Sequence, residues 1–321
     1  MSRRTQLALL LVGVAAFVLL VHQAGPAVLL QQVRGAGWVL LPVILVFGLV
    51  YLCNSESWRL TMHERPPLIS TPRAYAITVW AFALNYVTPM VSVGGEPFKI
   101  ASASRWLGRR GATASVLGER LLHMQGHLLF FFTGVVLAFV ELPRTVIGMV
   151  PLSIVAIALL AVGSIALMPH RRGGAVRLLD WLRRLPLPHR WIEWMGRKRE
   201  AAEEVDSQLT AFYHDSPRRY VGAVALEYLG RCISVVELML IAGAIGVPVS
   251  YGVAFLIASF ASFAVNLLFF LPFGLGAREV GLYAIFALLG LPPELGVVAS
   301  VLGRIRELTW IAIGLLLGMF A

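Results

Sequence analysis

The sequence predicts an all-α polytopic membrane protein with about six full spans and two re-entrant helical hairpins in an inverted repeat. Hydrophobic residues make up 58% of the chain, charged residues make up 14%, and the mean hydropathy is +0.79. A soluble protein of 321 residues would have to leave much of this apolar surface in water, whereas lipid solvates it directly. We therefore expect residues 1–321 to form a single membrane domain.

Continuous apolar runs define the full spans. They are expected at residues 6–22, 38–58, 112–140, 145–168, 217–246 and 296–320. The first run follows Arg3 and Arg4 and so begins like a signal peptide, but no small-residue cleavage site comes after it. We expect it to be retained as the first spanning helix.

Two further apolar stretches, residues 74–106 and 250–290, are interrupted by proline and glycine. The first contains NYVTP at 85–89 and GGEP at 94–97; the second contains Asn266 and then LPFGLGARE at 271–279. Proline removes a backbone donor and glycine frees the chain, so each stretch should break. Broken backbone within a membrane is tolerated only inside protein or beside a wet cavity, which favours re-entrant hairpins over ordinary kinked helices.

The two stretches resemble each other. In each, an asparagine precedes a proline by four to six residues, and a glutamate follows that proline by seven. Downstream, Val116-Leu117-Gly118 with Arg120 matches Val301-Leu302-Gly303 with Arg304. The offset stays between 181 and 185 residues, which indicates an internal duplication.

The distribution of basic residues orients the chain. The formal net charge is +10, and in the expected topology 19 lysines and arginines face the cytoplasm while two, Arg34 and Arg144, face the other side. Both termini are then cytoplasmic, and the hairpins enter from opposite faces. Such an inverted repeat is typical of transporters, with the binding site near mid-membrane where the hairpin tips converge.

The one polar region, residues 169–216, is expected to form an amphipathic cytoplasmic segment. Ala202, Val205, Leu209 and Phe212 recur at helical spacing, opposite charged residues that include Glu203. A helix lying on the lipid headgroups is the natural interpretation. The segment is too short for a catalytic domain.

Charges within spans are costly and usually face a cavity or a partner. Helix spacing allows local pairs between Glu227 and Arg231 and between Arg304 and Glu307. Helix N-termini near Glu96 and Ala277 would point free amides and positive dipole ends at the membrane centre. Together with nearby arginines they could receive an anionic phosphate headgroup; the glutamates could instead bind a cationic headgroup, carry protons or only tie helices together.

Other chemistry is weakly supported. His123 and His127 have metal-ligand spacing without a clear third ligand, so a polar helix contact is favoured over a metal site. We find no nucleotide-binding glycine loop and no Ser/His/Asp set, and we expect no cofactor and no nucleic-acid partner. Cys53 and Cys232 lie in apolar runs and are expected to act as small hydrophobic residues.

At these motifs the chain resembles the lysylphosphatidylglycerol synthase transmembrane region and flippase-like membrane proteins, including the hopanoid-associated group. The resemblance rests on NYVTPMVSVGGEPFK at 85–99, VLGER at 116–120, LPFGLGAREVGL at 271–282 and ALLGLPPEL at 287–295. It implies movement of an amphiphilic lipid between leaflets. Full-length members also carry a soluble synthase domain; the chain ends at Ala321, so we expect the flippase-like part without lysyl transfer and no enzyme activity.

The sequence thus predicts a lipid translocase of a bacterial cytoplasmic membrane, acting on a phospholipid or related amphiphile. A membrane enzyme or accessory subunit in lipid modification and an inverted-repeat transporter of ions or small solutes remain alternatives. A homo-oligomer and a separate lipid-modifying enzyme remain open as partners. The expected lipid-binding residues are Asn85, Pro89, Gly94, Gly95, Glu96, Lys99, Glu119, Arg120, Glu227, Arg231, Asn266, Pro272, Gly274, Gly276, Arg278, Glu279, Arg304 and Glu307.

Overall fold

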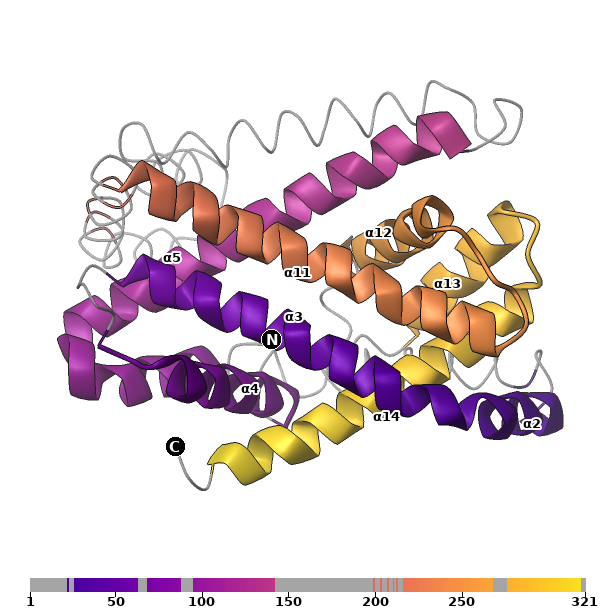
Figure 1. The fold of residues 1–321 in the computed structure, drawn as a ribbon, viewed down its shortest axis with the longest axis horizontal. Coiled ribbons are helices and arrows are strands. Elements are labelled where there is room, and N and C mark those ends of the chain that lie inside the picture. The colour runs from indigo at the N-terminus through magenta and orange to yellow at the C-terminus, as the bar shows by residue number, and fades with distance from the viewer. Residues whose placement is uncertain are drawn as a thin grey trace, which may run out of the picture.

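The computed structural model describes residues 22, 26–62, 68–87, 95–141, 199, 203, 207, 210, 212, 216–267 and 276–318. Within these ranges every regular element is a helix, which confirms the predicted all-helical class for this part of the chain (Figure 1). The elements are α2 (Pro26–Ala36), the 3-10 turn η1 (Gly37–Val39), α3 (Leu40–Thr61), α4 (Thr71–Val87), α5 (Gly95–Glu141), α11 (Pro217–Ala244), α12 (Tyr251–Leu267), α13 (Ala277–Leu288) and α14 (Pro293–Gly318).

Four of the predicted spans coincide with α3, the second part of α5, α11 and α14. The spans at 6–22, apart from His22, and at 145–168 lie outside the described residues. By length and composition, Leu30–Thr61 and Gly95–Glu141 are the two described helices that are apolar enough to cross a membrane. Helices α11 and α14 have sufficient length but carry several charged residues along it.

The distribution of side chains reverses that of a soluble protein. On α3, Leu41, Leu45 and Leu49 recur every four residues and are 66%, 64% and 51% exposed. Meanwhile Glu279 is 0% and Arg306 3% exposed. An apolar stripe of this size on the outside, with charges inside, suits a surface solvated by lipid.

The described helices fall into two units of matching order. In the first, α4 is followed, after residues 88–94, by α5; in the second, α12 is followed, after residues 268–276, by α13 and α14. These two intervals are here called the first and the second break. Gly108 (φ 66°) bends α5, and Gly290 (φ 70°) separates α13 from α14, because both adopt the left-handed backbone that glycine tolerates.

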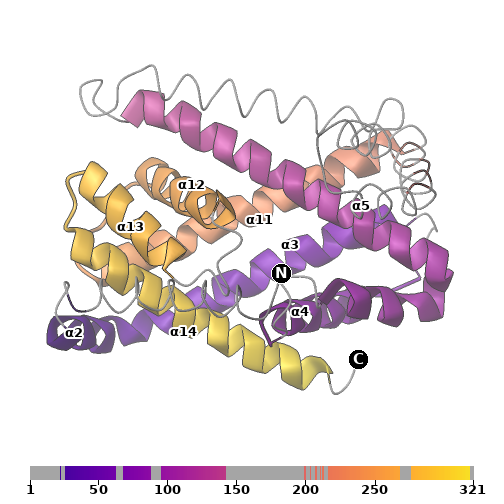
Figure 2. The same cartoon turned by 180° about the vertical axis from the view of Figure 1, so that it is seen from behind.

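The two units cross each other around a central antiparallel pair, α3 and α11 (Figures 1 and 2). The long helix of each unit packs on the first helix of the other, α14 on α4 and α5 on α12. At these crossings a Cβ on Gly314 would lie 2.6 Å from the Val79 carbonyl oxygen, and one on Gly134 would lie 2.6 Å from Cβ of Ser259. Both the glycines and the residues facing them are 180 positions apart in sequence.

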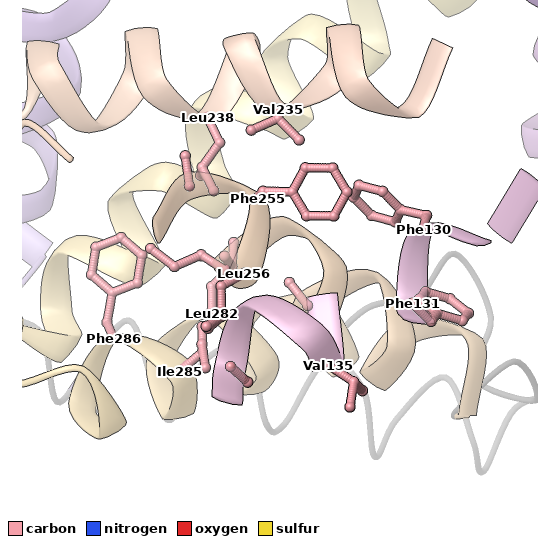
Figure 3. Packing of buried hydrophobic residues seen from close by; sticks show 14 residues of the cluster. Phe130, Phe131, Val135, Val235, Leu238, Phe255, Leu256, Leu282, Ile285 and Phe286 are labelled. Atoms are coloured by element: carbon pink, nitrogen blue, oxygen red, sulfur yellow. The ribbon is translucent and has the colours of Figure 1, made fainter. Parts of the chain in front are cut away.

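A hydrophobic core holds the second unit against α5 and α11. Phe130 of α5 and Phe255 of α12 have ring centroids 4.6 Å apart, and Phe286 of α13 is fully buried in the same cluster (Figure 3). Val235 and Leu238 close the cluster from α11. This packing places the start of α13 beside α14 and close to the helix breaks, where the buried charges gather.

Candidate functional site

A first group of charges lies between α5 and α11 and is here called the first cluster. It comprises Glu96, Lys99, Glu119, Arg120, His123, Glu227 and Arg231. Nζ of Lys99 lies 2.6 Å from both carboxylate oxygens of Glu119, and Arg120 forms an ion pair with Glu96. The bend at Gly108 makes this possible, because it folds the start of α5 back alongside its own second part.

Helix α3 closes the first cluster with an aromatic ring. Trp58, which is fully buried, lies with its ring centroid 4.0 Å from Nζ of Lys99. Its indole N–H points to Oγ of Ser115 at 3.3 Å, which fixes the ring against α5. A cation over a buried indole face gains electrostatic attraction, so Trp58 compensates part of the desolvation of Lys99.

His123 joins α5 to α11. Its Nδ1 lies 2.7 Å from Oε2 of Glu227, and its Nε2 lies 2.7 Å from Nη2 of Arg231. The sequence suggested a direct pair between Glu227 and Arg231, one helical turn apart, but in the structure the imidazole stands between them. Gly126 allows this approach, since a Cβ there would lie 2.8 Å from Cβ of Glu227.

A second cluster lies at the start of α13 and along α14. It comprises Glu237, Arg278, Glu279, Arg304, Arg306 and Glu307. Nε of Arg304 donates to Glu279 at 2.7 Å, and Nη1 of Arg278 donates to Glu307 at 2.5 Å. The local pair expected between Arg304 and Glu307 is therefore replaced by two contacts to α13, because the neighbouring helix offers better-placed partners.

Glu279 occupies the N-terminus of its own helix. The amide of Gly276 donates to Oε2 at 2.9 Å, and Oγ of Ser300 donates to Oε1 at 2.9 Å. The amide of Gly95, at the start of α5, donates to Oδ1 of Asn85 at 2.7 Å. The sequence predicted that these helix ends would offer free amides to an anion; instead, protein oxygens already occupy part of both positions, and at α13 the oxygen is a carboxylate.

The third pair of the second cluster links α14 to α11. Nε of Arg306 donates to Glu237 at 3.0 Å, and Nη2 donates to its other oxygen at 3.2 Å. The guanidinium carbon lies 3.5 Å from the ring centroid of Phe47 on α3. This two-point contact ties three helices together at the middle of the molecule.

One ion pair recurs in both units. Glu96 with Arg120 joins the helix after the first break to the following long helix, and Glu279 with Arg304 does the same after the second break. Each cluster contains three acids and three arginines or lysines. With a neutral His123, neither cluster carries a net charge. A charged group of a ligand, of either sign, can therefore bind only by replacing one member of an existing ion pair.

Comparison with known proteins now supplies a family. Residues 6–316 match the family described as Lysylphosphatidylglycerol synthase TM region. The chain belongs to this family. The match covers nearly the whole chain and concerns the membrane region of the synthase, so the membrane assignment made from hydropathy is confirmed. No curated protein and no solved structure gives a significant match.

All ten charged residues predicted for the site of this transmembrane region fall in the two clusters. Asn85 and Gly95 lie beside the first break, and Gly276 lies at the second. Asn266 does not join either cluster: it is exposed, and its side chain donates to the Ser262 carbonyl oxygen at 2.8 Å. Pro89, Gly94, Pro272 and Gly274 lie outside the described residues.

Three residues of the clusters, and the tryptophan that covers the first cluster, were absent from the predicted site. Glu237 and Arg306 are charged residues within predicted spans. The high free-energy cost of placing a charge in lipid already marks them as candidate site residues. His123 was interpreted as a polar helix contact, and its partners across the interface could not be deduced from spacing on one helix. Trp58 gave no signal, because an apolar aromatic residue in an apolar run has nothing to distinguish it.

Tyrosines connect the first break to the second cluster. Tyr86, in the last turn of α4, lies within electrostatic range of Arg278 and Glu307. Tyr51 of α3 is 3% exposed, and within the described part of the chain its hydroxyl has no hydrogen-bond partner. Both hydroxyls thus lie near charges of the second cluster. Within the described ranges no group of three His, Cys, Asp or Glu is placed to hold a metal ion.

Proposed function

We propose that this transmembrane region moves a polar-headgroup lipid between the two leaflets, with the headgroup passing along the two buried clusters. The observation that carries the proposal is the pairing of a lipid-exposed apolar surface with two internal, neutral groups of ion pairs at two helix breaks. Membership in a family named for a lipid synthase makes a lipid the natural substrate class. The tails would remain in the bilayer while the headgroup crosses.

The arrangement of helix ends supports an inverted repeat. In Figure 1 the end of α3, the start of α4, the bend of α5 and the start of α11 gather on the left, whereas α2, the end of α11 and the α13–α14 turn gather on the right. The helix termini of the first group carry Arg59, Arg73, Arg109, Arg110 and Arg218; the second group carries Arg34. This asymmetry follows the positive-inside rule if the long axis of the molecule lies along the membrane normal.

The neutral clusters favour a headgroup that carries charge of both signs. A phosphate can replace a carboxylate on an arginine such as Arg304, because both present oxygens to the guanidinium fork. An ammonium group can then bind the carboxylate that has been released. Exchange of partners avoids leaving a charge unpaired in a medium of low dielectric constant.

Reconstitution tests the function. The full chain would be placed in liposomes containing fluorescent phospholipids with zwitterionic, anionic or cationic headgroups, and lipid arrival in the outer leaflet measured by chemical bleaching. We expect the parent to move at least one class. Glu279→Gln should slow it roughly tenfold, because a hydrogen bond to a charged group contributes about 1.5–3 kcal/mol.

The matched control is Glu203→Gln, which neutralises an exposed glutamate that pairs with Arg199 at 3.1 Å. It should leave the rate unchanged. Glu279→Gln leaves the guanidinium of Arg304 without its carboxylate partner, and an unpaired buried charge destabilises the fold. The double variant Glu279→Gln/Arg304→Gln removes that charge as well, so it distinguishes loss of the site from loss of folding. Absence of lipid movement by the folded parent under every gradient would contradict the proposal.

A further inference from the structure

The hydrogen bonds of His123 determine its protonation. A guanidinium can only donate, so Nε2, 2.7 Å from Nη2 of Arg231, must present its lone pair. The ring proton then lies on Nδ1 and is donated to Oε2 of Glu227 at 2.7 Å. The structure therefore holds a neutral imidazole between a carboxylate and a guanidinium.

The carboxylate of Glu227 can accept a further hydrogen bond. Glu227 is 1% exposed, and its Oε1 is buried without a hydrogen-bond partner among the described residues. Ser57, across the interface on α3, donates its hydroxyl to the Ala223 carbonyl at 3.1 Å and also lies close to the Glu227 carboxylate. A buried carboxylate with an oxygen short of hydrogen bonds costs free energy, and such a cost is usually retained for a function.

Titratable groups from three helices surround the site. Helix α5 contributes Lys99, Glu119, Arg120 and His127, helix α11 contributes Arg231, and helix α3 contributes the thiol of Cys53. The imidazole side chain of His123 is 27% exposed, whereas the carboxylate of Glu227 is 0% exposed. The imidazole of His123 is therefore more accessible than the carboxylate to which it donates.

We propose that Glu227, His123 and Arg231 form a proton-binding site that couples lipid movement to proton uptake. The coupling rests on the proposed lipid translocation. A proton from water binds Nε2 of His123, which turns that nitrogen from acceptor to donor and ends its hydrogen bond with Arg231. The charge of the first cluster rises from zero to +1, and the released guanidinium repels the new imidazolium. A phosphate group can then bind Arg231, and release of the proton restores the original bonds.

The site has no counterpart among the described residues of the second unit. The shift of 184 residues that relates Arg120 to Arg304 places Glu307 at the position of His123, and Glu307 pairs with arginines only. One unit thus combines ion pairs with an imidazole, whereas the described part of the other has ion pairs alone. A coupled transporter needs only one group that carries the proton, and in this proposal the first cluster supplies it.

His123→Gln is the decisive variant. A glutamine amide can donate to Glu227 and accept from Arg231, so it preserves the neutral network but cannot take up the proton. In proteoliposomes we expect an imposed pH gradient to change the rate of lipid movement by the parent. The variant should keep gradient-free exchange and lose this response. The control His22→Gln removes an exposed imidazole and should keep the response.

Two outcomes separate the proposals. Lipid movement by the parent that is insensitive to the pH gradient overturns the coupling and leaves the translocase intact. If the parent moves no lipid at all, proton binding is still measured directly with a pH indicator as the solubilised protein is acidified from neutral pH. The parent should take up one proton more than His123→Gln, and equal uptake overturns the site.

Discussion

At the scale of single residues, the protein pairs its deeply buried charges with partners that the fold brings close, most of them on another helix. Arg306 and Glu237 illustrate the principle: their side chains are 4% and 7% exposed, and two hydrogen bonds join them. Phe47 covers the guanidinium at 3.5 Å. Desolvation makes either charge unfavourable when it is buried alone, so each residue is tolerated at its position only when the other is present.

Breaking this pair should destabilise the protein more than removing it. Arg306→Met leaves the carboxylate of Glu237 without its main partner and should cost about 3–5 kcal/mol. The double variant Arg306→Met/Glu237→Leu removes both charges and should recover most of that loss. Thermal unfolding of the purified proteins in detergent ranks the stabilities of the parent and the two variants. A double variant less stable than Arg306→Met would show that the contact acts through something other than charge compensation.

At the scale of helices, small residues let the two units cross closely. Gly134 of α5 faces Ser259 of α12, and Gly314 of α14 faces Val79 and Ala83 of α4. Apolar area gives little drive for helix association in lipid, so close backbone approach and packing must supply it. The same kind of contact at both crossings brings each long helix, with its charges, against the other unit.

Adding one methyl group at either crossing should separate the units. A Cβ on Gly314 would lie 2.8 Å from Cβ of Ala83, a distance that requires the helices to shift. We expect Gly134→Ala and Gly314→Ala each to lower stability by about 1–3 kcal/mol, the usual cost of overpacking. The matched control is Gly243→Ala on α11, where nothing lies within 4 Å. Unfolding temperatures in detergent compare the three; equal values for all would contradict the close crossings.

The sequence predicted the helices and most of the site charges, but not their partners. Helical spacing tells which residues share a face, so Glu227 with Arg231 and Arg304 with Glu307 were reasonable local pairs. The actual partners come from α5 and α13 respectively. Such contacts depend on how helices cross, which is set by glycines whose role becomes visible only in three dimensions.

The matching motifs that predict a repeat do not guarantee that matching residues make the same contacts. Motifs copied in order reveal a duplication, but copies diverge: Asn85 binds the amide of Gly95, whereas Asn266 is exposed and bonds to its own helix. The acid–arginine pair, by contrast, is kept in both units. Interactions that neutralise buried charge tolerate change less than polar contacts that water can replace.

At the scale of the whole molecule, the proposed inverted repeat would place the bend of α5 and the α13–α14 turn on opposite sides of the membrane. Arg110, just after the bend, and Glu294, at the start of α14, are both exposed. In a background in which Cys53 and Cys232 are replaced by alanine, we expect Arg110→Cys to react with a membrane-impermeant maleimide only in inside-out vesicles. Glu294→Cys should react only from the outer side of intact spheroplasts. Labelling of both cysteines from one side would contradict the inverted arrangement. It would also contradict the proposed passage of a headgroup between the clusters, because that passage requires access from one side of the membrane and then from the other.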